Sequence, residues 1–127
     1  MQKEVIQTDE VFPAQGPHSN AVRAGNLIFI AGQGARDREG KIIGLGDPVA
    51  QAEQALRNVG ALLKAAGASF DNVVMLRVYL TDMRHREALG KVRRQFMREP
   101  FPASTSIQVA ALALPEQMVM VEAVAVV

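Results

Sequence analysis

Apolar and polar residues alternate in several stretches of the chain, and this alternation predicts strands with one buried face. In AVRAGNLIFIAGQ, residues 21–33, Gly25 and Asn26 separate two apolar stretches, which predicts an antiparallel hairpin. Further strands are predicted within residues 72–82, 104–109 and 118–127. The positions that we expect to face the core are Val74, Leu76, Val78 and Leu80 in the middle strand and Val119, Val121, Ala123 and Ala125 in the last strand.

Two other segments have helical spacing. Asp47 suits a helix N-cap and Pro48 the first helical position, and the apolar pattern that follows ends at Gly67. A second helix is predicted after Asp82 and ends at the EPFP segment. The apolar stripes consist of Ala52, Leu56, Val59, Leu63 and Ala66 in the first helix and of Leu89, Val92 and Phe96 in the second. The glycine-rich, charged residues 34–47 are predicted to form a surface loop or a short ribbon.

The order strand, strand, helix, strand, helix, strand, strand indicates an α+β sheet with both helices packed on one face. The opposite face would carry Met75, Tyr79, Met118, Met120 and Val124. Such a face is too apolar to be left in water by a monomer, so we predict that the protein is an oligomer. The polar residues expected near the subunit boundaries, where clefts for small molecules form, are Arg77, Ser104, Ser106, Gln108 and Glu122.

Length and composition are those of one globular domain spanning residues 1–127, with 49% hydrophobic and 21% charged residues. No apolar run reaches the roughly 20 residues of a membrane span, and the first ten residues are too polar for a signal peptide. We therefore expect no membrane partner and a cytoplasmic location. The chain has no cysteine and only two histidines, far apart in sequence, so a metal site is not expected.

The net charge of +1 does not indicate a nucleic-acid partner. The second predicted helix does carry a basic patch, made of Arg84, Arg86, Lys91, Arg93, Arg94 and Arg98. Phe96, the one phenylalanine among these cations, belongs to the apolar stripe of the helix, although single-stranded RNA is normally bound by stacking on aromatic side chains. A solvated helix face is therefore the preferred interpretation.

Glu122 stands out in the apolar tail MVMVEAVAVV. Burying an unpaired carboxylate costs several kcal/mol, roughly, so this side chain either faces water, pairs with another group or is held for chemistry.

Five stretches, GPHSNAV, IFIAGQ, NVGALLKAAGASFDNVVMLRVYLTDM, FPASTSIQVAALALP and VEAVAVV, together resemble the RidA family, also called YjgF or L-PSP endoribonuclease. The resemblance implies a chorismate mutase-like α+β domain with a mixed six-stranded sheet and two helices on one face. It also implies a homotrimeric barrel with three ligand sites between subunits. The best-known members hydrolyse enamines and imines, such as 2-aminoacrylate, without a cofactor. RNA cleavage, indicated by the older family label, is the more remote alternative.

The motif PARS, whose arginine binds the substrate carboxylate in that branch, reads PAST here, so Ser104 replaces the arginine. This chain also has His18 for a tyrosine, Ala31 for a serine and Ser106 for a frequent cysteine, whereas Glu122 and Gly32 match the family pocket. The pattern resembles an arginine-less branch. It implies a substrate other than a simple 2-imino acid, or a small-molecule-binding or chaperone-like trimer without catalysis.

Each candidate residue has a functional and a structural interpretation. Glu122 could orient or deprotonate a hydrolytic water, or accept hydrogen bonds from backbone or from Arg77 of another chain. His18 could serve as an acid or base, or be an ordinary loop histidine. Arg77 could replace the missing anion contact, or form a salt bridge across the trimer interface. Ser104 and Ser106 could hydrogen-bond a polar substrate but have no paired base, and Ala31 and Gly32 would line the pocket through backbone.

Overall fold

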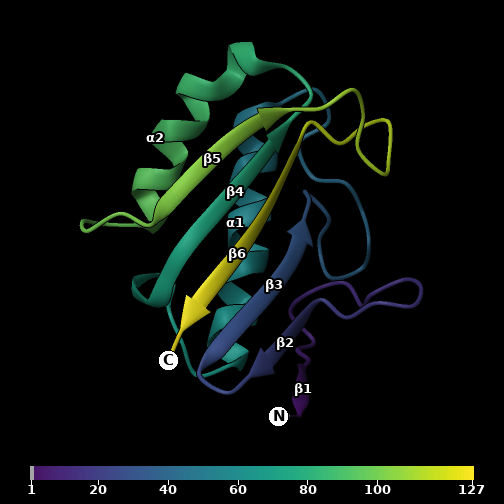
Figure 1. Ribbon diagram of the computed structural model, residues 1–127. Helices are drawn as coiled ribbons and strands as arrows, with labels where there is room; N and C mark the ends of the chain where they lie inside the picture. The colour runs from purple at the N-terminus through teal and green to yellow at the C-terminus, as the bar shows by residue number, and fades with distance from the viewer. Residues whose placement is uncertain (1) are drawn as a thin grey trace.

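The computed structural model describes residues 2–127, which form one six-stranded mixed sheet and two α-helices (Figure 1). The strands are β1 (Lys3–Ile6), β2 (Ala21–Ala24), β3 (Leu27–Gln33), β4 (Val73–Leu80), β5 (Ala103–Gln108) and β6 (Val119–Val126). The helices are α1 (Pro48–Ala65) and α2 (Arg86–Phe96), with short 3-10 turns η1 (Phe70–Asn72) and η2 (Met83–His85). The strand order is β1-β2-β3-β6-β4-β5, and all neighbours are antiparallel except β4 and β5.

The predicted caps and turns are confirmed. Asp47 is the N-cap of α1 and accepts hydrogen bonds from the N–H groups of Val49 and Ala50, while Pro48 opens the helix. The hairpin turn uses Gly25, whose φ of 61° is left-handed. No helix among residues 2–127 combines the length and the apolar character needed to cross a membrane.

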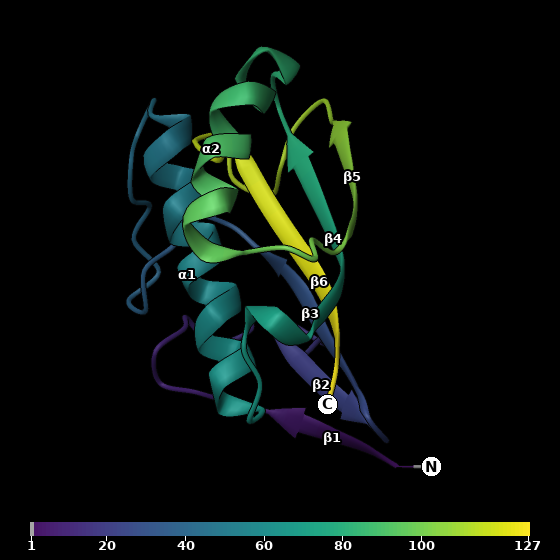
Figure 2. The same cartoon turned by 90° about the vertical axis from the view of Figure 1, so that its left-hand side faces the viewer.

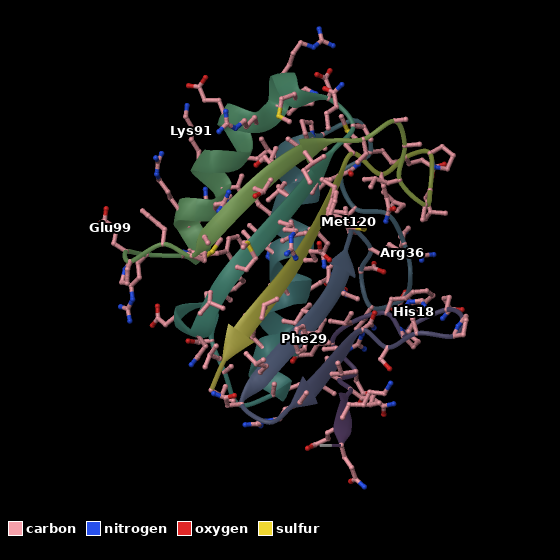
Figure 3. The ribbon with its side chains drawn as sticks, in the orientation of Figure 1. His18, Phe29, Arg36, Lys91, Glu99 and Met120 are labelled. Atoms are coloured by element: carbon pink, nitrogen blue, oxygen red, sulfur yellow. The ribbon has the colours of Figure 1, made fainter. Side chains whose placement is uncertain are left out.

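Both helices cover the same face of the sheet, as predicted, and Figure 2 shows the other face bare of secondary structure. The core lies between the layers and includes Leu56, Leu63, Leu76 and Val121, each no more than 2% exposed. The uncovered side is called the open face below. One row of residues paired between neighbouring strands lies on it, namely Val5, Val22, Phe29, Val124 and Met75. Phe29 is 41% exposed on this face (Figure 3).

Two local features differ from the sequence-based expectation. The pattern did not indicate β1, because KEVI is short and only Ile6 of its four residues is buried. In β4, Val73 is buried and Val74 is 47% exposed, which reverses the expected facing of this pair. The reason is a register shift between Val73 and Met75 in the pairing with β6, a β-bulge that breaks the alternation.

The pairing of β5 determines on which face of the sheet its side chains lie. Because β5 pairs in register with β4, Ser104, Ser106 and Gln108 lie beside Leu76, Val78 and Leu80 on the helix-covered face. Gln108 Oε1 accepts a hydrogen bond of 2.8 Å from the N–H of Met83, at the start of η2. Within one chain, these three side chains therefore do not lie on the same face of the sheet as Glu122.

Candidate active site

Glu122 lies near the middle of β6 and points to the open face of the sheet. Its neighbours on that strand, Val121 and Ala123, are buried against the helices, as the alternation predicted. Arg77 of β4 lies directly opposite Glu122. On the other side, β3 has a register shift between Ile30 and Gln33, so two residues, Ala31 and Gly32, stand across from Glu122.

The Glu122 carboxylate has two partners, both from β4. The Tyr79 hydroxyl donates a short hydrogen bond to Oε1 of Glu122. Arg77 Nη1 lies 3.5 Å from the same oxygen. The side chains of Arg77 and Glu122 are 42% and 30% exposed, so this is a partly solvated pair and not a buried one. An Arg77–Glu122 contact between two chains was one of the structural interpretations of these residues, and the contact forms here within one chain.

The charges of the site shift the pKa of the Tyr79 phenol. The hydrogen bond to Glu122 raises the pKa of the Tyr79 phenol above its ordinary value of 10, and desolvation and the negative charge of Glu122 act in the same direction. The positive charge of Arg77 opposes this rise in the pKa only in part. Tyr79 therefore keeps its proton throughout the neutral range and remains a hydrogen-bond donor.

A cavity of about 620 Å³ on the open face brings four of the candidate residues together, namely His18, Ala31, Arg77 and Glu122. His18 comes from the exposed loop before β2, where its N–H donates to the carbonyl of Gly16 at 2.9 Å (Figure 3). Lys3 and Phe29 also line this cavity. The cavity thus combines two cations, one carboxylate, one imidazole and an apolar wall.

Gly32 faces a second cavity of about 310 Å³, which His18 and Met120 also line. A Cβ at position 32 would meet Met120 Sδ at 2.5 Å. Glycine at the bulge therefore lets the Met120 side chain pack directly on its backbone, and a larger residue would displace Met120.

Ser104 and Ser106 are not brought to Glu122 within the chain, because they lie on the opposite face of the sheet. β5 is an edge strand, and Ser104 is exposed there. These two hydroxyls can meet a Glu122 carboxylate only if it belongs to a neighbouring subunit.

The basic patch is partly neutralised. Arg84 binds the carboxylate of Asp82, with an Nη2–Oδ2 distance of 2.7 Å, and Arg98 binds Asp71, with an Nη2–Oδ2 distance of 2.6 Å. Desolvation lowers the pKa of Arg93, which is partly buried. Two of the six cations of the patch are therefore paired with carboxylates.

Within residues 2–127, no group of three or more His, Asp or Glu side chains has an arrangement suited to a metal ion. Tyr79, which contacts Glu122, was not named as a candidate from the sequence, and neither were Lys3 and Phe29 of the cavity wall. The alternation in β4 already placed Tyr79 on the face of Arg77, but only the pairing with β6 shows that it reaches Glu122.

The chain is similar to known proteins over most of its length. A family model described as Endoribonuclease L-PSP matches residues 8–127. The 2-iminobutanoate/2-iminopropanoate deaminase of Capra hircus is 40% identical over 110 residues, which are 87% of this chain and 80% of that protein. The crystal structure of RidA from the Antarctic bacterium Psychrobacter sp. has 37% identity and a TM-score of 0.92, covering 98% of this chain and 99% of that one. The structure of E. coli TdcF with bound serine has 30% identity and a TM-score of 0.90, covering 98% of both chains. The chain therefore belongs to the L-PSP endoribonuclease family, which includes the RidA deaminases.

Proposed function

We propose that this protein hydrolyses reactive imines, and enamines by way of their imine tautomers, breaking the C=N bond and releasing a carbonyl product and ammonia. The observation that carries the proposal is the arrangement of Glu122, with one oxygen bound by Tyr79 and Arg77, in a cavity that His18 also lines. Kinship with 2-iminobutanoate/2-iminopropanoate deaminases supports this reaction class.

In the proposed mechanism, Glu122 accepts a proton from water and the resulting hydroxide attacks the imine carbon. Glu122 passes this proton to the imine nitrogen as the tetrahedral carbinolamine forms. His18 then gives a proton to the amine, ammonia leaves as the C=O bond forms, and the proton of the carbinolamine hydroxyl returns to His18. The balance is one imine and one water to one carbonyl compound and one ammonia, so the reaction needs no oxidant and no cofactor.

The substrate is proposed to differ from a simple 2-imino acid. Ser104 cannot form the two parallel charge-assisted hydrogen bonds that arginine makes with a carboxylate. Arg77 is the first candidate to supply an anion contact instead. Its 3.5 Å approach to Glu122 is longer than the roughly 2.8 Å of a good charge-assisted hydrogen bond, so its donors are not fully used.

The complete site is proposed to lie between subunits of a homotrimer. Exposed apolar side chains on the open face, including Val5, Phe29 and Ile107, support burial by other copies. Ser104 and Ser106 would then reach the cavity from an adjacent subunit and hydrogen-bond the ligand. Light scattering tests this assembly, and a stable monomer at low concentration would contradict it.

A second candidate is a small-molecule-binding protein of the same family that has lost the chemistry. Ser104 favours this alternative, because it stands where the deaminases have their carboxylate-binding arginine. TdcF, a relative of known structure, has the amino acid serine bound as a ligand. This alternative predicts saturable binding of serine or a similar amino acid without turnover.

The deciding experiment measures hydrolysis of 2-iminobutyrate, generated in situ by an amino-acid oxidase, by the wild type and by Ser104→Arg. Turnover by the wild type supports the hydrolase and makes Arg77 the next residue to test. Turnover only by the variant supports an intact water-activating site adapted to another substrate. If both proteins are silent, the binding protein is favoured. If Glu122→Ala and His18→Ala retain wild-type turnover on a genuine substrate, the assignment of these two residues is wrong.

A further inference from the structure

Tyr79 is the only tyrosine of the chain, and the proposed reaction has so far given it no role. It lies directly opposite Met120 in the β4–β6 pairing, two residues from the Arg77–Glu122 pair. Diagonal neighbours in an antiparallel pair are within reach of a long aromatic side chain. This geometry brings the phenol to the Glu122 carboxylate, to which it donates a hydrogen bond.

We propose that Tyr79 is a positioning residue that, together with Arg77, binds one oxygen of Glu122 so that the other oxygen is presented to the cavity. This inference rests on the proposed function, because it assigns a role in that reaction.

The distribution of contacts over the two carboxylate oxygens carries the inference. Both side-chain donors contact Oε1, and within residues 2–127 no hydrogen bond is made to Oε2. No buried side-chain nitrogen or oxygen in this part of the chain lacks a partner, so the unbonded Oε2 is accessible to solvent. Rotation about the last bond of a glutamate side chain is only weakly restricted. Two donors on Oε1 therefore limit this rotation and leave Oε2 free for water.

Tyr79 is not suited to be the acid of the reaction. The carboxylate raises the pKa of its phenol above 10, which opposes release of the proton near neutrality. A hydroxyl that keeps its proton is, however, a constant donor to Oε1. The role of proton donor then falls to His18, which lines the same cavity.

A spectroscopic titration tests the contact without any substrate. Because the chain has one tyrosine and no tryptophan, its tyrosinate absorbance reports Tyr79 alone. The wild type should titrate at a midpoint above 10, and Glu122→Gln should titrate at a lower midpoint, because a neutral amide is a weaker acceptor. Equal midpoints in the two proteins would overturn the proposal.

A double-mutant cycle tests the role in the reaction. Tyr79→Phe removes only the hydroxyl, and kcat should fall about 10- to 100-fold with KM within about 2-fold, as expected for loss of a hydrogen bond to a charged group. In the Glu122→Gln background the same change should alter the residual rate by less than about 2-fold, because its target has gone. Met75→Leu, a change on the same face of β4, should leave kcat unchanged.

Equal losses in the two backgrounds would mean that the Tyr79 hydroxyl does not act through Glu122, and the proposal would be overturned. A wild type without turnover on any imine would overturn the hydrolase function itself, and with it a role for Tyr79 in that reaction. The two failures are distinguishable, because the first requires an active wild type and the second an inactive one.

Discussion

Arg77 lies directly opposite Glu122 in the antiparallel pairing of β4 with β6, and its Nη1 is 3.5 Å from Oε1 of Glu122. The pair is partly exposed, so its contribution to folding is expected to be small. Its position in the cavity is what makes it of interest for ligand binding.

Arg77→Gln should change the free energy of unfolding by less than about 1 kcal/mol. It should raise KM for an imine that carries a carboxylate by about tenfold or more, because a charge-assisted hydrogen bond to the ligand is lost. Arg57→Gln removes a comparable exposed pair, Arg57–Glu53 at 3.4 Å on α1, and should leave KM unchanged. An unchanged KM in Arg77→Gln would show that Arg77 makes no contact with the ligand.

Two glycines in open space should respond oppositely to alanine. At neither Gly90 nor Gly67 would a Cβ meet another atom within 4 Å, but Gly67 has a φ of +77°. Gly90→Ala in α2 should stabilise the fold by about 0.5–1 kcal/mol and raise the Tm by roughly 2–4 °C. Gly67→Ala should destabilise it by about 1 kcal/mol, because alanine is strained at that φ. Calorimetry of both variants is the measurement, and a Tm change of the same sign in both would contradict the argument.

Gln51→Leu should destabilise the protein by about 2–3 kcal/mol. Gln51 is fully buried, and its Nε2 donates to the carbonyls of Gly44 and Glu116 at 3.1 and 2.9 Å. The N–H of Met118 donates to its Oε1 at 2.7 Å. Leucine would leave the Glu116 carbonyl and the Met118 N–H without these partners, whereas the Gly44 carbonyl would keep its hydrogen bond from the Asp47 N–H. Denaturant unfolding measures the loss, and Gln95→Leu, at an exposed position of α2, should stay within about 0.5 kcal/mol of the wild type.

Asp82 should contribute to the acid stability of the fold. Hydrogen bonds from the side chain and backbone N–H of Arg84 lower the pKa of Asp82 from 3.8 to about 2. Between these values the unfolded chain binds more protons than the folded one, so stability falls as the pH falls. In Asp82→Asn, the free energy of unfolding should therefore depend less on pH between about pH 4 and about pH 2. Arg84→Gln should have a smaller effect in the same direction, because the backbone donor remains. An unaltered pH dependence in Asp82→Asn would contradict the expectation.

Phe29→Lys should weaken the proposed trimer, because a cation would stand in the middle of the open face. Light scattering at several concentrations should show a lower mass than for the wild type, with an unchanged circular dichroism spectrum. Leu45→Lys is the matched control, since Leu45 is 69% exposed in the loop before α1. A wild-type mass for Phe29→Lys would mean that the open face is not the contact surface.

Local signals in the sequence predicted most of the fold because they act over a few residues. The Asp47–Pro48 pair sets the start of α1 through capping, and the alternation in β6 directs Glu122 away from the core. The same reasoning failed where the backbone departs from regularity. The bulge at Val74 changes which side chain is buried, and nothing in two adjacent valines indicates a bulge.

The chain by itself thus determined both helices, five of the six strands, the two faces of the sheet and the presence of one carboxylate on the apolar tail. Only the tertiary structure decided what that carboxylate meets. Tyr79 and Glu122 are 43 residues apart in sequence, and their contact depends on the β4–β6 register. The parallel pairing of β5 likewise placed Ser104 on the face opposite to Glu122. Register depends on how whole strands bury their apolar faces together, so it cannot be read from the residues of one strand alone.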